Sequence, residues 1–102
     1  MSAKKEENRY PRTEVRWPVT IRSSLGQADG VTRNISFGGA CVQFTEPPPR
    51  DEIFWMAIKP PDYSPLEVSA EVVWINMHWT GIRFIEISEK DQRFLCRLVF
   101  DP

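Results

Sequence analysis

The sequence predicts an all-β domain, a six-stranded antiparallel β-barrel with one C-terminal α-helix. Short apolar segments with two-residue alternation recur along most of the chain, as expected for strands with one buried face. Turn residues separate these segments at nearly regular intervals, with no helical pattern between them, which is typical of an antiparallel barrel or sandwich. Only the final segment has the spacing of an amphipathic helix.

Each predicted strand is bounded by residues that interrupt a β-ladder. Pro18 lies within the first strand and indicates an edge or a bulge there. The segment SSLGQADG, residues 23–30, is expected to be a turn, and the Gly38-Gly39 pair separates the second strand from the third. Prolines within residues 59–65 end the fourth strand. The predicted strands cover residues 15–22, 31–35, 40–44, 52–58, 66–75 and 80–87.

The fifth strand has the clearest alternation between apolar and polar residues. Glu67, Ser69 and Glu71 are expected on its solvent face. The residues expected to point into the barrel are Val68, Ala70, Val72 and Trp74, with Ile82 and Phe84 of the last strand beside them.

The remaining tryptophans fall into two groups. Trp17 and Trp55 occupy apolar strand positions and are expected in the core. Trp79 lies beside a predicted turn, so we expect it to be the exposed tryptophan.

The final segment is predicted to be one amphipathic helix that covers an open end of the barrel. Ser88 begins the sequence SEKD, and its hydroxyl can cap the helix. Asp91, three residues later, can complete a capping box with it. The apolar stripe of this helix consists of Phe94, Leu95, Leu98 and Val99.

The composition indicates a single soluble domain. The chain has 102 residues, which leaves too little sequence for a second core. It contains 26% charged residues and no apolar run near the roughly 18 residues that span a bilayer, so membrane insertion is not expected. The first residues do not resemble a secretory signal, which makes the cytoplasm the expected location. Cys41 and Cys96 match no metal spacing and are expected to be buried, reduced thiols.

The charge is distributed unevenly along the chain. The net charge is −1, yet residues 1–22 contain six basic and three acidic residues, a net +3, which leaves −4 for the rest. Residues 1–10 are polar and aperiodic, so we expect a flexible N-terminal arm before a barrel domain at residues 11–102, and we expect a ligand to order the arm. A basic arm on an acidic body suits a small anion better than a long phosphate backbone, so neither DNA nor RNA is an expected partner.

Residues suited to catalysis or metal binding are few. His78 is the only histidine and lies in a predicted turn, so an exposed or cross-strand position is expected. The acidic residues alternate along strands or lie in the final helix, which is typical of solvated faces. The sequence therefore predicts a protein that is not an enzyme and that needs no cofactor.

Two clusters combine residue types that bind phosphate or guanine. NRYPRTEVR contains Arg9, Arg12 and Arg16, and a guanidinium can grip a phosphate, or guanine O6 and N7, through two hydrogen bonds. NISFGGA contains Asn34 and Ser36, which project to the same side of a strand and precede glycines that allow close approach of a ligand. Either cluster alone is compatible with an ordinary strand start or a bulged hairpin.

Together, the two clusters resemble the PilZ family, which is marked by R-x-x-x-R in its N-terminal segment and by D/N-x-S-x-x-G between its second and third strands. The second motif matches as Asn34, Ser36 and Gly39. The resemblance extends over nearly the whole chain, including VSAEVVWI, TGIRFIEI and the closing helix. It implies a PilZ-type barrel that binds cyclic di-GMP, with the arginines at the phosphates and guanines and the second motif on the same surface.

The first motif fits in two registers. Read literally, the two arginines of the motif are Arg12 and Arg16. The PRTEVRWPV context instead aligns Arg12 with the second arginine of the family motif. In that register Asn8 occupies the position of the first arginine, and Arg9 lies one residue after it. The resemblance implies a cyclic di-GMP receptor or adaptor that signals through conformational change or through contact with a downstream protein partner. The alternative is a degenerate PilZ module that binds protein and no nucleotide.

Overall fold

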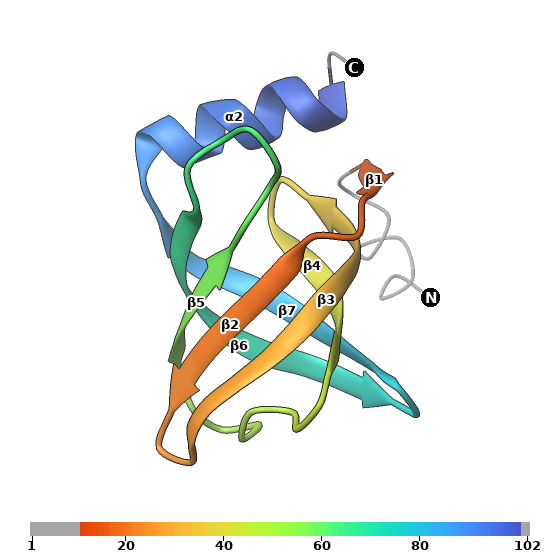
Figure 1. Ribbon diagram of the computed structural model, residues 1–102, viewed down its shortest axis with the longest axis vertical. Coiled ribbons are helices and arrows are strands. Elements are labelled where there is room, and N and C mark those ends of the chain that lie inside the picture. The colour runs from red at the N-terminus through yellow and green to blue at the C-terminus, as the bar shows by residue number, and fades with distance from the viewer. Residues whose placement is uncertain (1–10, 101–102) are drawn as a thin grey trace, which may run out of the picture.

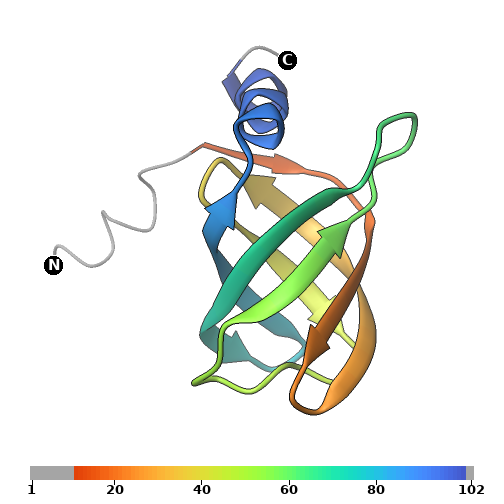
Figure 2. The ribbon, with the colours of Figure 1, turned by 90° about the vertical axis from the view of Figure 1, so that its left-hand side faces the viewer.

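Residues 11–100 are described by the computed structural model, and they form an antiparallel β-barrel with a helix across one end (Figures 1 and 2). The elements are β1 (Arg12–Glu14), β2 (Pro18–Ser23), β3 (Gly26–Ser36), β4 (Gly39–Phe44), β5 (Phe54–Ile58), β6 (Leu66–Asn76), β7 (Trp79–Ile87) and α2 (Glu89–Phe100). Hydrogen-bonded neighbours follow the order β3-β2-β5-β6-β7-β4, and pairing of β4 with β3 closes the ring. β1 is an extra strand that pairs with β3 outside this ring. The predicted fold class, a six-stranded barrel with a C-terminal helix, is confirmed.

Alternation along the strands places the apolar core inside the ring. Val68, Ala70 and Val72 of β6 are buried, and Ile82 of β7 is buried beside them, as predicted. Phe84 is half-buried and packs against this core. Other strands and the helix contribute the buried residues Val19, Ile21, Ile35, Val42, Phe54, Met56, Ile58, Leu66 and Leu95.

The prediction that Trp74 points into the barrel is wrong. The β6–β7 pairing shifts between Val72 and Trp74, so that Val73 forms a bulge. As a result, Trp74 is 38% exposed on the outer surface. Two-residue alternation does not anticipate such a shift, because one extra residue moves every later side chain to the other face.

The other tryptophans differ in part from the prediction. Trp17 is half-buried and packs against the core, as expected. Trp55 alternates with buried neighbours on β5 and therefore faces outwards, where the guanidinium of Arg22 lies 4.7 Å from its ring centre. Trp79 is half-buried rather than exposed, and Arg33 lies over its ring at 5.0 Å.

The first residues of β3 and β2 differ most from the predicted strand boundaries. β3 begins at Gly26, because residues 26–30 pair with β2 and only Ser24 and Leu25 form the turn. Gly26 has a φ of 107°, a conformation that glycine adopts without steric cost. Pro18 is the first residue of β2, an interior strand, rather than part of an edge or a bulge. A strand's first residue tolerates the missing N–H of proline.

Thr32 fixes the segment that joins β1 to β2. Its buried Oγ1 donates to the carbonyl of Val15 at 2.5 Å and accepts from the backbone N–H of Trp17 at 2.9 Å. The backbone N–H of Thr32 donates to the Trp17 carbonyl at 2.9 Å. Val15 and Trp17 consequently pack against the core, while Arg16 between them is exposed.

Replacing Thr32 with valine is expected to lower the free energy of unfolding by about 1–3 kcal/mol, because the similarly shaped side chain leaves the part-buried Val15 carbonyl and Trp17 N–H without this partner. Urea unfolding followed by circular dichroism measures the change. Thr20→Val is the matched control, since the hydroxyl of Thr20 makes exposed hydrogen bonds, and its change should stay within about 0.5 kcal/mol. Equal losses in the two variants would contradict the role of Thr32.

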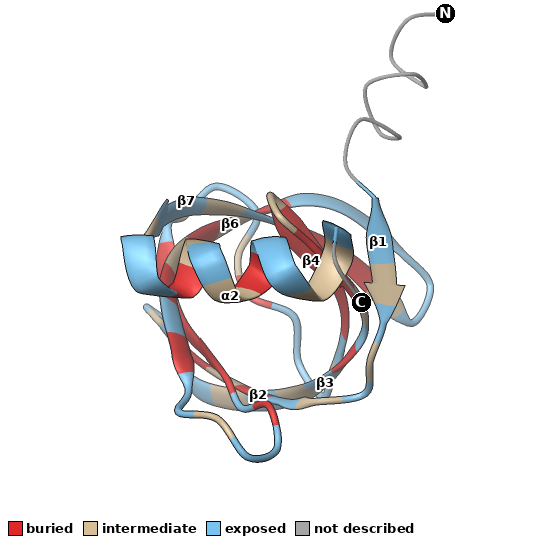
Figure 3. Ribbon diagram, turned by 90° about the horizontal axis from the view of Figure 1, so that it is seen from above, coloured by how far each residue is buried: buried red, intermediate tan, exposed pale blue. Residues whose placement is uncertain are grey.

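Helix α2 lies across one end of the barrel (Figures 1 and 3). Ser88 caps it as predicted, because its Oγ accepts a hydrogen bond from the backbone N–H of Asp91 at 3.1 Å. Leu95 is fully buried, and Phe94 stacks on Tyr63 with ring centres 4.1 Å apart. Within residues 11–100, no helix has the length and apolar character needed to cross a membrane.

Candidate functional site

Pairing of β1 with β3 brings the two predicted clusters together. Arg12 is opposite Ser36 in this ladder, and Glu14 is opposite Asn34. Nη1 of Arg12 donates a hydrogen bond to Oδ1 of Asn34 at 3.0 Å. A guanidinium has five N–H donors, so this bond orients Arg12 and leaves donors for a ligand. Arg12 is exposed and Asn34 is half-buried.

Arg12 lies at the junction of two surface cavities. Their volumes are about 230 Å³ and about 340 Å³, and both are lined by Arg12 and Trp74. The smaller cavity continues over Ser36, Gly39, Gly81 and Arg83, and the larger one over Ile75 and Asn76. We call Arg12, Asn34, Trp74 and Arg83, with these cavities, the Arg12 surface.

Trp74 forms an aromatic wall of this surface. It is opposite Gly81 in the β6–β7 ladder, and a Cβ atom at Gly81 would collide with the indole ring. The indole therefore packs directly against the Gly81 backbone, which is possible only because that position has no side chain. Trp74 remains accessible, since the residue is 38% exposed and lines both cavities.

Arg83 contributes a second cation to the same surface. It lies on β7, opposite Gly39 of β4 and Glu71 of β6. Its guanidinium forms an ion pair with Glu71, and its side chain remains 61% exposed. Arg83 is thus partly neutralised but still accessible at the cavity wall.

Ser36 and Gly39 shape the turn between β3 and β4. Oγ of Ser36 accepts hydrogen bonds from the backbone N–H groups of Gly38 and Gly39, at 3.3 and 3.2 Å, and donates to the Gly39 carbonyl at 3.3 Å. These bonds use the one donor and the two acceptor positions of a hydroxyl. A Cβ atom at Gly39 would collide with the carbonyl oxygen of Ile82. Close approach of β4 to β7 therefore requires glycine at this position.

Arg16 is not among the residues that line the cavities of the Arg12 surface. It is exposed in the segment between β1 and β2. Arg9 lies outside the described residues, as do the predicted flexible arm at residues 1–10 and its ordering by a ligand. Of the three predicted arginines, Arg12 is the one that the described part of the chain places beside the second motif.

Sequence reasoning missed Trp74 and Arg83 as members of this surface. Strand alternation assigned Trp74 to the core because the bulge at Val73 has no sequence signature. Arg83 is a charged residue within the apolar segment TGIRFI, and this pattern could have indicated a functional position. Its position opposite Gly39 becomes evident only once β4 is known to pair with β7.

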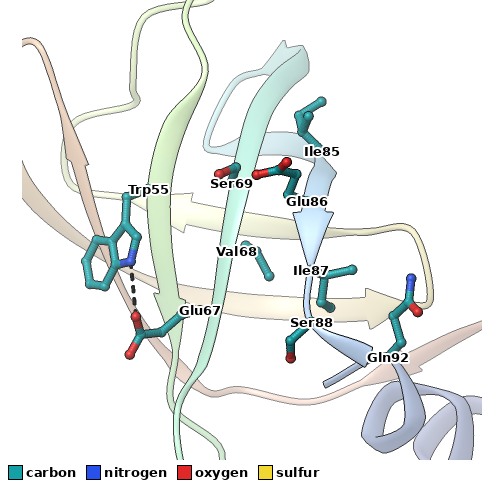
Figure 4. Close-up of a pocket in the computed structure, with 9 residues that line it drawn as sticks. All are labelled: Trp55, Glu67, Val68, Ser69, Ile85, Glu86, Ile87, Ser88 and Gln92. Carbon is teal, nitrogen blue, oxygen red and sulfur yellow. Dashed lines mark hydrogen bonds between the residues drawn. The ribbon is translucent and has the colours of Figure 1, made fainter. Parts of the chain in front are cut away.

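A larger cavity lies elsewhere and has acidic walls. Its volume is about 660 Å³, and it is lined by residues of β5, β6, β7 and α2 (Figure 4). Trp55 lines it and donates from Nε1 to Oε1 of Glu67 at 3.4 Å, and Glu86 carries another carboxylate. Carboxylates repel a phosphate, so charge favours the Arg12 surface for an anionic ligand. Among residues 11–100, no three His, Cys, Asp or Glu side chains could together hold a metal ion.

The two cysteines differ in exposure. The prediction of burial is correct for Cys41 and wrong for Cys96, which lies on an exposed position of α2, and both thiols are free. Burial raises the pKa of the Cys41 thiol and outweighs the opposing effect of the positive charges on Arg33 and Arg12.

We expect a thiol reagent at pH 8 to modify Cys96 first, while Cys41 stays protected until the domain unfolds. Two causes act together: Cys41 is buried, and its raised pKa leaves less of the reactive thiolate. Mass spectrometry of the native and denatured protein counts the modified thiols. Equal rates at the two cysteines in the native domain would contradict this assignment.

Comparisons with known proteins agree with the observed fold. A family model described as the PilZ domain matches residues 6–101. The Bacillus subtilis inhibitor of motility (MotI/DgrA) is similar with a TM-score of 0.77 and 22% identity over 89% of this chain and 48% of that chain. Escherichia coli YcgR in complex with c-di-GMP gives a TM-score of 0.75 and 16% identity over 89% of this chain and 43% of that chain. The PilZ domain of CeSA from a cellulose-synthesising bacterium gives a TM-score of 0.65 and 23% identity over 87% of this chain and 94% of that chain.

These comparisons differ in how much of each protein they cover. The chain spans less than half the length of the MotI and YcgR chains. A search of curated proteins found no match. At these identities the solved structures establish the fold, whereas the family model extends over nearly the whole chain. The chain therefore belongs to the PilZ domain family.

Proposed function

We propose that this PilZ domain is a receptor for cyclic di-GMP and that the nucleotide binds at the Arg12 surface. The observation that carries the proposal is the hydrogen bond that orients Arg12 against Asn34, beside the cavities lined by Trp74. Family membership supports the proposal, as does the fold shared with a YcgR structure that contains c-di-GMP.

The chemistry of the Arg12 surface matches that of a cyclic dinucleotide. Such a ligand carries two phosphate diesters and two guanine bases. Arg12 can donate paired hydrogen bonds to a phosphate oxygen or to the O6 and N7 edge of guanine. The exposed part of the Trp74 indole offers a face on which a base can stack. Arg83, which lines the smaller cavity, adds positive charge there.

The residues of the second motif have different roles in this proposal. Asn34 orients Arg12 and, being half-buried, can also reach the ligand. Ser36 and Gly39 line the smaller cavity and act by shaping the turn between β3 and β4. The position of Arg16, outside both cavities, favours the register in which Arg12 is the second family arginine and Arg9 stands near the first.

The proposed activity is binding, without a chemical step. A receptor of this kind works in the cytoplasm through differential affinity: the nucleotide stabilises one conformation, or one set of contacts with a downstream protein partner, over another. The domain is then an adaptor between the second messenger and that partner.

Calorimetric titration of the purified domain with cyclic di-GMP tests the proposal. We expect saturable binding, with weaker binding of GMP because the mononucleotide carries one base and one phosphate. Affinity should fall as the salt concentration rises, since the ligand is anionic and the surface is cationic. An absence of saturable binding at millimolar cyclic di-GMP would contradict the receptor and favour a degenerate module that binds protein alone.

A further inference from the structure

Arg33 is displaced from the regular β-ladder by a bulge next to the Arg12 surface. In the β3–β4 pairing, Thr32 is opposite Val42 and Asn34 is opposite Cys41, so Arg33 has no opposite residue. Bulges of this kind re-aim a side chain and are frequent beside functional sites. Arg33 is exposed and directly precedes Asn34, the residue that orients Arg12.

The Arg33 side chain is held by an aromatic ring. Its guanidinium lies over the ring of Trp79 on β7, 5.0 Å from the ring centre. A cation over an aromatic face is held by the ring's electrostatic field, which restricts the side chain while its N–H donors remain free at the edges. Arg33 is therefore partly preordered to receive a ligand.

The ring that holds Arg33 lies beside the larger cavity of the Arg12 surface: Trp79 is opposite Asn76 in the β6–β7 ladder, and Asn76 lines that cavity together with Arg12. The positive charges of Arg33 and Arg12 both act on the thiol of Cys41, which pairs with Asn34 in the β3–β4 ladder. Among residues 11–100, neither arginine forms an ion pair, whereas Arg83 is paired with Glu71. A guanidinium that forms no ion pair favours a bound anion such as a phosphate.

We propose that Arg33 is a second guanidinium of the nucleotide site, which contacts a phosphate of cyclic di-GMP together with Arg12. The assignment rests on the proposed function and adds a residue outside both family motifs. Like Arg16, Arg33 lines neither cavity, but it directly precedes Asn34 and is held over Trp79, which is opposite the cavity residue Asn76.

Titration of Arg33→Ala with cyclic di-GMP tests this assignment. Loss of a charge-assisted contact is expected to raise the Kd about tenfold to a hundredfold and to weaken the salt dependence of binding. Arg22→Ala is the matched control, because Arg22 also lies over a tryptophan, Trp55, at 4.7 Å. Its Kd should equal that of the wild type, since Trp55 lines the acidic cavity.

The Trp79 indole N–H provides a second readout that does not depend on affinity. In the wild type, its NMR signal should shift on saturation with cyclic di-GMP, because Arg33 exchanges part of its contact with the ring for a phosphate. In Arg33→Ala at saturating ligand that shift should be lost. An unchanged Kd in Arg33→Ala, alongside saturable wild-type binding, would overturn the Arg33 assignment and leave the receptor intact. No wild-type binding at all would overturn both.

Discussion

Replacing Arg12 with alanine is expected to weaken the binding of cyclic di-GMP by about one to two orders of magnitude. The substitution removes a charge-assisted contact worth roughly 1.5–3 kcal/mol. The guanidinium that is lost is the one that Asn34 orients and that lines both cavities. Arg12 is exposed, so the fold should survive, and circular dichroism checks that it does. Calorimetric titration measures the affinity.

Two further substitutions make the Arg12 result specific. Arg12→Lys should recover little affinity, because lysine keeps the charge but lacks the planar pair of donors. An Arg12→Lys affinity close to the wild type would mean that only diffuse electrostatics acts at this position. Arg16→Ala removes an exposed arginine that lines neither cavity, so it should have little effect. A loss at Arg16 as large as at Arg12, with Arg9→Ala neutral, would select the literal register of the first motif.

Replacing Trp74 with alanine is expected to weaken binding by about 1–3 kcal/mol, roughly fivefold to 150-fold, because a base loses its stacking partner. Trp74→Phe should retain most of the affinity, since a phenyl ring preserves an aromatic face. The indole is 38% exposed and lies outside the barrel, so the loss of thermal stability should be small beside the loss of affinity. Parallel titration and thermal unfolding of both variants separate the two effects.

Trp55→Ala is the matched control for Trp74. Trp55 is also a half-exposed tryptophan on the outer surface, but it lines the acidic cavity. Its removal should leave the affinity for cyclic di-GMP unchanged. Weaker binding in Trp55→Ala together with wild-type affinity in Trp74→Ala would contradict the proposed location of the site.

The fold could be predicted because most strands obey simple alternation. Val68, Ala70 and Val72 face the core, and Ser88 caps the helix, since these features depend on local pattern and local hydrogen bonding. Residues 26–30 could not be assigned, because their glycine and aspartate favour a turn in isolation and pairing with β2 overrides that preference.

The candidate site was predicted only in part. Arg12, Asn34 and their neighbours in the motifs were found because their residue types fit phosphate and guanine, and the β1–β3 ladder brings them together. Trp74 and Arg33 were not found, because each owes its position to a bulge. A bulge depends on how two strands pair, and neither strand's own sequence specifies it.

The most direct test of the central claim is an NMR titration of the ¹⁵N-labelled domain with cyclic di-GMP, followed through the indole N–H signals of its four tryptophans. Single Trp→Phe variants assign the signals. The account predicts a saturable shift of the Trp74 signal, while the Trp55 signal in the acidic cavity stays unchanged. A saturable shift of Trp55 with Trp74 unaffected, or no shift at any tryptophan, would contradict it.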